Sequence, residues 1–239
     1  MGAYKSTARA IGILFIIASA AAIIGGTLAL PATEADFLSE AAGSEGRVVI
    51  GLILELVLAL AVFGMAALFF PILKKQHEGM ALGYVATRTL EGVLIAAGTI
   101  SAALMLAVSK GFGPEATAEG VEPLADVLLA AREWTYWFGP MAVFSVSALI
   151  LNWLLYRSRV VPTWISIWGF IGGVLLLASA VLEMFGQTLG WWQAVFTAPI
   201  GVNEMVLAVW LIIKGFDMRH LEPEPTPERE LVGAGVRED

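Results

Sequence analysis

The chain has 239 residues, of which 58% are hydrophobic, and 14 basic against 21 acidic residues give a formal net charge of −7. The apolar fraction exceeds the roughly 45–50% of soluble domains, which favours a membrane protein. Cysteine is absent, which excludes disulfides, thiolate-ligated haem and cysteine-based zinc sites. Both histidines, His77 and His220, fall in predicted polar loops, which excludes a bis-histidine haem within the membrane. The negative charge lies in loops and tail, so nucleic acid is not an expected partner.

Six apolar runs each reach about the 20 residues that a membrane-spanning helix needs. They cover residues 8–30, 48–72, 80–108, 134–156, 163–185 and 194–214. The sequence therefore predicts an all-α polytopic integral membrane protein, with one six-helix transmembrane domain over residues 1–216 in contact with the lipid bilayer. The segment 217–239 is rich in proline and glutamate and cannot bury apolar surface, so a disordered acidic cytoplasmic tail is expected there.

The charges between the runs predict the orientation. Basic residues gather at alternate ends of the runs: Lys5, Arg9, Lys74, Lys75, Arg157, Arg159, Lys214 and Arg219. The opposite loops are mainly acidic, so the positive-inside rule places both termini in the cytoplasm. A cleaved secretory signal is the alternative for the first run, because two basic residues precede it and small residues follow it. Its roughly 20 apolar residues exceed the usual 7–15 of a signal, which favours a retained helix, and the mass of the purified protein distinguishes the two.

Small residues recur at four-residue spacing in the first run, at Ala18, Ala22 and Gly26. Such a stripe allows two helix backbones to approach closely. We expect it to serve packing within the monomer, with a seam between copies in a homo-oligomer as the alternative.

The second and third runs carry charged residues within their apolar sequence. Glu55 lies in the outer half of the second run, and Arg88 and Glu91 lie three residues apart, hence on one face, in the third. The arginine and the glutamate can pair within the helix, which is equally consistent with a structural role. Because the connection 76–79 is short, these two helices are expected to be antiparallel neighbours.

Aromatic residues open the fourth run. Trp134, Tyr136 and Trp137 are typical of the outer headgroup region of a membrane, where tryptophan and tyrosine are enriched. Arg132 and Glu133 come directly before them and are therefore expected at the interface, outside the site.

The fifth and sixth runs add three further polar candidates. Glu183 lies towards the outer end of the fifth, where it can reach water, and Asn203 and Glu204 lie near the middle of the sixth. A charged side chain at that depth costs at least about 2.5–3.5 kcal/mol, so Glu204 needs a partner, a proton or water. Pro199 and Gly201 are expected to break the sixth helix and to expose carbonyl groups beside Glu204.

Three motifs resemble a known family. They are Arg-x-x-Glu-Gly at Arg88, Glu91 and Gly92, the segment 155–162, and the segment 203–216. Over residues 8–216 the chain is similar to the prokaryotic membrane proteins grouped as domain-of-unknown-function family 4386. The resemblance implies a six-helix fold in the plasma membrane of a prokaryote. It implies no settled activity, and it supplies no cofactor and no catalytic residues.

The functional hypothesis depends on the balance of charge among the buried polar residues. The candidate ligand-binding cluster consists of the polar residues predicted at bilayer depth: Glu55, Arg88, Glu91, Glu183, Asn203 and Glu204. Four carboxylates face one guanidinium in this set, and such an excess persists where a proton or a cation neutralises it. We therefore expect an outward-opening, transport-like pocket for a small polar or cationic solute, or for protons.

Two other functions stay open. In a structural or accessory membrane subunit, the polar cluster only fixes helix packing. In an intramembrane enzyme acting on lipid, the carboxylates serve as acid and base. The sequence shows neither a nucleophile–base pair nor a metal motif, which makes an enzyme the less favoured alternative. No cofactor and no metal site are predicted.

Overall fold

The computed structural model describes residues 2–34, 36–112 and 121–219, and every regular element in these residues is helical. Six helices are long and apolar enough to cross a membrane: Tyr4–Ala32, Ala42–Leu73, Glu78–Gly111, Pro123–Ser158, Thr163–Met184 and Trp192–Ile213. The predicted all-α fold with six spans is therefore confirmed. The expected disordered tail falls almost wholly on residues 220–239, outside the described residues, and so does His220.

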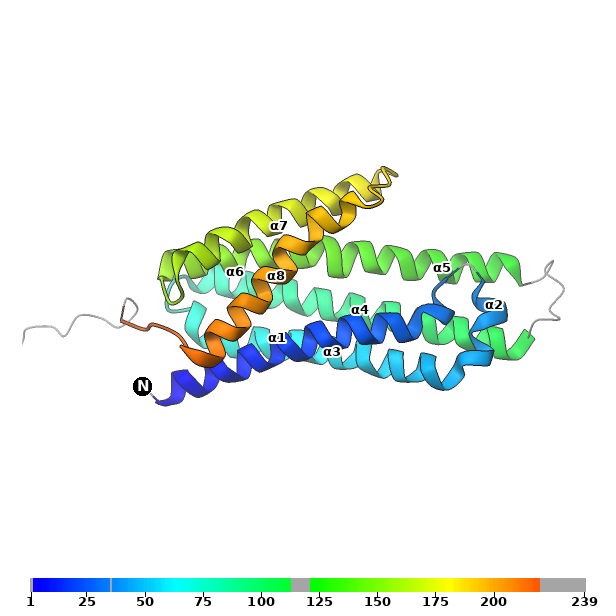
Figure 1. Ribbon diagram of the computed structural model, residues 1–239, viewed down its shortest axis with the longest axis horizontal. Coiled ribbons are helices and arrows are strands. Elements are labelled where there is room, and N and C mark those ends of the chain that lie inside the picture. The colour runs from blue at the N-terminus through cyan, green and yellow to red at the C-terminus, as the bar shows by residue number, and fades with distance from the viewer. Residues whose placement is uncertain (1, 35, 113–120, 220–239) are drawn as a thin grey trace, which may run out of the picture.

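The spans are built from seven long helices: α1 Gly2–Ala29, α3 Glu45–Leu73, α4 Glu78–Phe112, α5 Glu122–Tyr136, α6 Phe144–Ser158, α7 Thr163–Met184 and α8 Trp192–Ile213 (Figure 1). A short helix, α2 Phe37–Glu40, lies between α1 and α3, flanked by the 3₁₀ turns Leu30–Ala32 and Ala42–Ser44. A π-helical segment, Trp137–Val143, joins α5 to α6.

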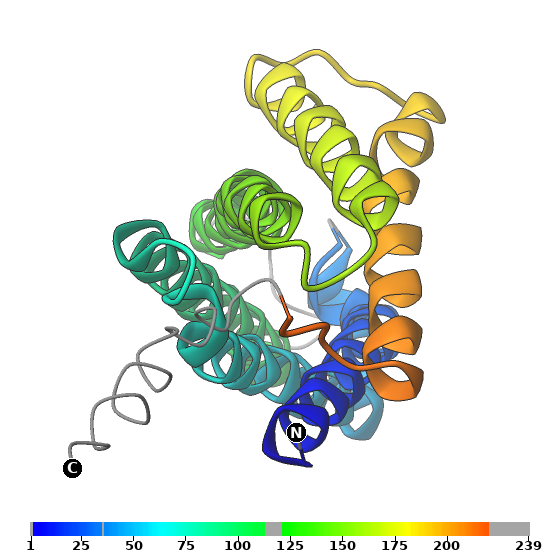
Figure 2. The same cartoon turned by 90° about the vertical axis from the view of Figure 1, so that its left-hand side faces the viewer.

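The helices close into a ring of neighbours. α1 packs on α3, α3 on α4, and α4 on α5 and α6, whereas α6 packs on α7, α7 on α8, and α8 returns to α1. α3 and α4 are antiparallel neighbours, as their short connection predicted. α7 and α8 form a pair that diverges from α1 and α3 towards the end where α7 finishes and α8 begins, while the other end of α8 lies against α1 (Figure 2). At 22 residues each they are also shorter than α4, which has 35.

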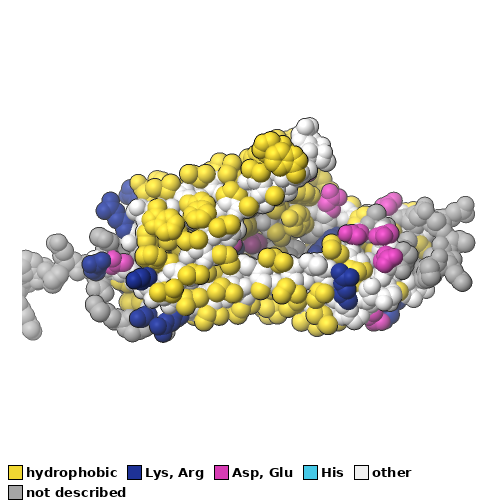
Figure 3. Space-filling view, viewed as in Figure 1, with side chains coloured by type: hydrophobic (Ala, Val, Ile, Leu, Met, Phe, Trp, Pro, Cys, Tyr) yellow, Lys and Arg dark blue, Asp and Glu magenta, His cyan; other side chains and the backbone are white. Residues whose placement is uncertain are grey.

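Charge separates along the length of the molecule. Basic side chains gather at one end, mainly acidic ones at the other, and apolar side chains cover the surface between them (Figure 3). We call these the basic end and the acidic end. The described residues nearest the two termini meet at the basic end, where Arg9 Nε donates to the carbonyl of Ile212 at 3.4 Å. The amide of Asp217 also donates to Val160 O, at 2.9 Å.

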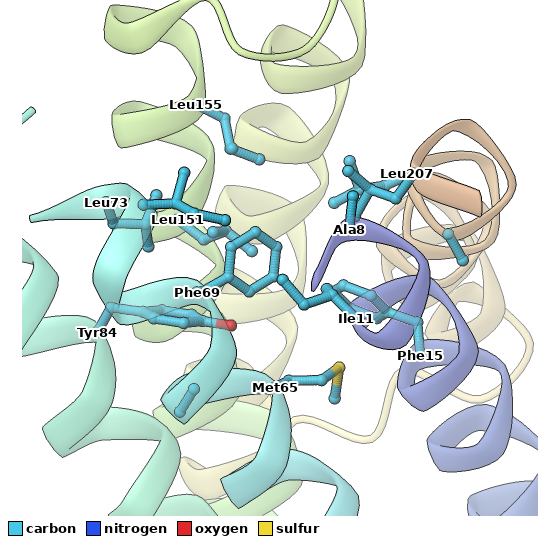
Figure 4. Close-up of a cluster of buried hydrophobic side chains, with 14 of the residues drawn as sticks. Ala8, Ile11, Phe15, Met65, Phe69, Leu73, Tyr84, Leu151, Leu155 and Leu207 are labelled. Carbon is cyan, nitrogen blue, oxygen red and sulfur yellow. The ribbon is translucent and has the colours of Figure 1, made fainter. Parts of the chain in front are cut away.

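An aromatic cluster at the basic end fixes the helices that carry the site. The ring of Phe69 on α3 contacts those of Phe15, Tyr84 and Phe216 edge-on, with centroids 5.8–6.3 Å apart. Figure 4 shows these helices converging on Phe69, with Leu151 of α6 among its neighbours. Edge-to-face aromatic packing of this kind is specific in geometry. It sets α4 at Tyr84, one helical turn before Arg88.

Glycines allow the closest contacts between helices, but only some of the small residues that were expected to make such contacts do so. A Cβ atom on Gly51 would lie 2.8 Å from Gly25 O, so α1 and α3 touch there through backbone. The predicted stripe is wrong in part, because Ala22 is exposed and nothing lies within 4 Å of a Cβ atom on Gly26. Gly25 makes the backbone contact with α3, whereas the helical repeat of 3.6 residues turns Ala22 and Gly26 towards a cavity that Glu55 and Leu58 of α3 also line.

The fourth span begins well before the aromatic residues that were expected to open it. α5, the π-helical segment and α6 form one apolar helix, Pro123–Ser158. Pro140 lies inside the π-helical segment, where the wider turn accommodates a residue that has no amide hydrogen to donate. Arg132 is therefore an internal residue of this long helix and pairs with Glu55, so its predicted place outside the site is wrong.

Candidate functional site

Two groups of polar and ionisable side chains lie along one face of α4. Arg88 and Thr99 are eleven residues, or about three turns, apart, so both point to the same side, about 16 Å apart along the axis. Glu91 and Ile95 lie on the same face between them. Arg88 belongs to the group nearer the start of α4 at the basic end, and Thr99 to a group nearer the acidic end.

The first group, which we call the central ion group, consists of Arg88, Glu91 and Glu204. Arg88 Nη1 donates to both carboxylate oxygens of Glu91, at 3.0 and 3.2 Å, and its Nη2 donates to Glu204 Oε1 of α8 at 3.3 Å. The guanidinium carbon also lies 4.8 Å from the ring centroid of Phe144, a cation–π distance. These contacts hold the arginine from three helices.

The central ion group has one carboxylate more than its guanidinium can neutralise. Arg88 and Glu91 are buried, whereas the side chain of Glu204 is 19% exposed. Burial disfavours charge, and two carboxylates close together disfavour ionisation of both. The excess negative charge is relieved either by a proton or by a cation from outside.

The second group, which we call the acidic-end ion group, consists of Glu55, Thr99 and Arg132. Arg132 donates through both terminal nitrogens to the two carboxylate oxygens of Glu55, with Nη1 2.9 Å from Oε2. The hydroxyl of Thr99 donates to the same Oε2 at 2.8 Å. Two parallel charge-assisted bonds make this a strong pair, and its net charge is zero.

The predicted count of four carboxylates against one arginine is therefore wrong. Arg132 supplies a second guanidinium because the fourth span extends past Trp134 and Tyr136 towards the acidic end. The sequence carried a signal that the helix continues through this region, because one helix face bears three residues at helical spacing: Arg132, Thr135 and Gly139. That face meets α4 at Gly98, where a Cβ atom would lie 2.8 Å from Thr135 Oγ1 and 3.1 Å from Arg132 Nη1.

Two of the six predicted site residues lie apart from both ion groups. Glu183, half-buried near the end of α7, accepts a hydrogen bond from the amide of Leu189 at 2.8 Å. Asn203 is buried, but it donates through Nδ2 to Ile165 O of α7 at 2.8 Å. Consecutive residues of a helix point about 100° apart, so Asn203 faces α7 while Glu204 faces α4.

The sixth span is not broken. α8 is helical from Trp192 to Ile213 with Pro199 inside it, so the predicted break at Pro199 and Gly201 is wrong. Pro199 lies in the helix interior and removes a single backbone hydrogen bond. Thr197 Oγ1, which donates to Gln193 O at 2.9 Å, adds a side-chain bond to the same stretch of helix.

A cavity of about 150 Å³ adjoins the acidic-end ion group. Its lining includes Gly26 of α1, Leu58 of α3, Ile95 of α4 and the charged pair Glu55 and Arg132. One water needs only about 10–15 Å³ of such space, so the cavity has room for several. Acidic and basic atoms are visible at the bottom of a hollow between α8 and α1 (Figure 3). Buried Ile95 lies one turn from Glu91 and one turn from Thr99, and so separates the two ion groups.

The sequence comparison agrees with this architecture. The family model described as Domain of unknown function (DUF4386) matches residues 10–215, which include all six long apolar helices almost in full. No curated protein and no solved structure gave a significant match. Because the match covers most of the chain, the protein belongs to the DUF4386 family.

Proposed function

We propose that the central ion group binds a small cationic solute or a proton, and that the protein is a transport-like membrane protein. The observation that carries the proposal is the sharing of one guanidinium by two carboxylates, Glu91 and Glu204, inside an apolar helix bundle. In a low-dielectric interior the unneutralised carboxylate attracts positive charge strongly.

Glu204 is the carboxylate that exchanges its contact with Arg88 for a contact with the bound cation or proton. Its contact with Arg88 is 3.3 Å and single, whereas Glu91 accepts two bonds and is almost completely buried. The 19% exposure of the Glu204 side chain leaves it accessible to a visiting cation. Arg88 and Glu91 then act as a fixed pair, and Glu204 as the binding residue.

The cavity beside Glu55 and Arg132 is the route of access from the acidic end. A solute in this cavity meets a neutral ion pair, and it must pass the apolar layer of Leu58 and Ile95 to reach the central ion group. The positive-inside rule puts the basic end, with both termini, in the cytoplasm. The cavity then opens to the outside of the plasma membrane of a prokaryotic cell.

A structural or accessory subunit is the second candidate. The observation that favours it is the acidic-end ion group, in which Arg132 and Thr99 satisfy Glu55 completely and leave no excess charge. In that case the central ion group only fixes α8 against α4.

Thermal unfolding of the purified protein with and without added cations distinguishes the transport-like protein from the structural subunit. A panel of small inorganic and organic ammonium cations is added to the wild-type protein, to Glu204→Gln, and to Glu183→Gln, which removes the same charge outside both ion groups. A bound cation at about 100 times its dissociation constant stabilises the folded state by about 2.7 kcal/mol. We expect at least one cation to raise the unfolding midpoint of the wild type and of Glu183→Gln, but not of Glu204→Gln. A panel without effect, together with a lowered midpoint in Glu204→Gln, supports the structural subunit instead.

A further inference from the structure

Outside the two ion groups, the connection between α6 and α7 forms a pocket of about 460 Å³ at the basic end. We call it the arginine pocket, and it is lined by Gln76, Tyr156, Arg157, Arg159, Thr163 and Ile167. Because it lies where the basic side chains gather, it is at the level where a membrane protein meets lipid headgroups.

The two arginines of this pocket are available to an external anion. Arg157 and Arg159 are exposed, and among the described residues neither side chain forms an ion pair or a hydrogen bond. Arg159 ends α6 with a left-handed backbone, φ 52°, which is uncommon for a residue other than glycine. Its amide donates to Leu155 O at 3.0 Å, which fixes the turn that carries both arginines.

The start of α7 adds a second source of positive potential. Thr163 is the first residue of this 22-residue helix and lines the pocket, and no side chain caps the amides of the first turn. The amino-terminal end of a helix carries a partial positive charge and free N–H groups, which favour phosphate. The pocket therefore combines two unpaired guanidinium groups with an uncapped helix end.

An apolar groove continues from the arginine pocket along α6 and α7. A cavity of about 170 Å³ shares Tyr156 and Ile167 with the pocket and extends to Trp153, Phe170 and Ile171. From Thr163 to Ile171 the groove follows α7 for about 12 Å. Its apolar side chains face outwards, with Ile171 54% exposed. A charged pocket that opens into an apolar groove matches an amphiphile with an anionic head and an aliphatic chain.

We propose that an anionic glycerophospholipid of the surrounding bilayer binds at this site. Its phosphate faces Arg157, Arg159 and the first turn of α7, and one acyl chain lies in the groove beside Phe170 and Ile171. A zwitterionic lipid is a poorer match, because its ammonium group places positive charge beside the two arginines. Lipid binding here does not depend on a cation at Glu204, which lies on a different helix, α8.

Native mass spectrometry and thermal unfolding of the detergent-solubilised protein test the site. Phosphatidylglycerol and phosphatidylcholine with identical acyl chains are added to the wild type and to the double variant Arg157→Gln/Arg159→Gln. The control is Lys5→Gln/Lys74→Gln, which removes two charges from the same end without touching the pocket. Two arginines near an anionic lipid headgroup correspond to a preference of about thirtyfold for phosphatidylglycerol, since each contributes about 1 kcal/mol and about 1.4 kcal/mol is a factor of ten.

The expected result is that the wild type and the lysine control keep this preference, that the double arginine variant loses it, and that Arg157→Gln alone loses part of it. Since both arginines are exposed, the variants are expected to remain folded, and size-exclusion chromatography checks this. Equal binding of phosphatidylcholine, an equal loss in the lysine control, or an equal stabilisation by inorganic phosphate would each overturn the proposal.

Discussion

The guanidinium group of Arg132 donates to both carboxylate oxygens of Glu55, which lies 77 residues earlier in the chain on α3. This bidentate contact joins the second and fourth spans beside the cavity and cancels the charge of Glu55. Of the two ion groups, only the central one then has an excess of negative charge, because Glu91 and Glu204 share Arg88.

Replacing Arg132 by methionine should strongly destabilise the protein. Glu55 is left buried and unpaired, and breaking a buried pair from one side costs about 3–5 kcal/mol. We expect the lower end of that range, since the Arg132 side chain is 20% exposed. Chemical denaturation in detergent measures the loss. Glu133→Gln, at the exposed neighbouring residue, should change stability little, and Glu55→Gln in the Arg132→Met background should recover part of the loss. Equal stability of Arg132→Met and the wild type contradicts the pairing.

Gly98→Ala should weaken the same pair from the side of α4. The added methyl group meets Thr135 Oγ1 at 2.8 Å and Arg132 Nη1 at 3.1 Å, so one of the two side chains must move. Overpacking of this kind costs about 1–3 kcal/mol. Gly201→Ala on α8 is the control, because nothing lies within 4 Å of its added carbon. If thermal unfolding shows the two variants to be equally stable, the close approach at Gly98 is not correct.

Asn203→Ala should lower stability without changing cation binding. The single hydrogen bond that its side-chain amide donates to Ile165 O holds α8 against α7. Hydrogen bonds between membrane helices contribute about 0.6 kcal/mol on average and at most about 1.7 kcal/mol. Since Glu204 faces α4 rather than α7, the solute-induced shift of the unfolding midpoint should persist in this variant. If the cation-induced shift of the unfolding midpoint is lost in Asn203→Ala but kept in Glu204→Gln, then Asn203 rather than Glu204 is the binding residue.

Much of the fold follows directly from the sequence. Each apolar run is long enough to span a bilayer, and the three-residue spacing of Arg88 and Glu91 is enough to predict their pairing within one helix. Glu204 was predicted near the middle of the sixth run, at bilayer depth like Glu91, and the structure brings both carboxylates to Arg88. Depth is readable from a sequence because a helix rises by a fixed 1.5 Å per residue.

Other parts of the site depend on how each helix is rotated about its axis and on where each helix begins and ends. The depth of a residue, counted along the sequence, determines neither. Asn203 and Glu204 share a depth but face different helices, since one residue along a helix is a rotation of about 100°. Arg132 was misplaced because the aromatic residues after it were read as the start of a span. In the structure, the helix passes through them and continues through the π-helical segment around Pro140.

The central claim, that Glu204 carries an exchangeable positive charge, is tested most directly by flux into proteoliposomes. Wild-type protein, Glu204→Gln and Glu183→Gln are reconstituted at equal amounts of folded protein. Proton uptake is followed with an internal pH-sensitive dye, and cation uptake with the ion that shifts the unfolding midpoint. We predict flux above that of empty liposomes for the wild type and Glu183→Gln, and none for Glu204→Gln. Flux in Glu204→Gln equal to that of the wild type would contradict the account.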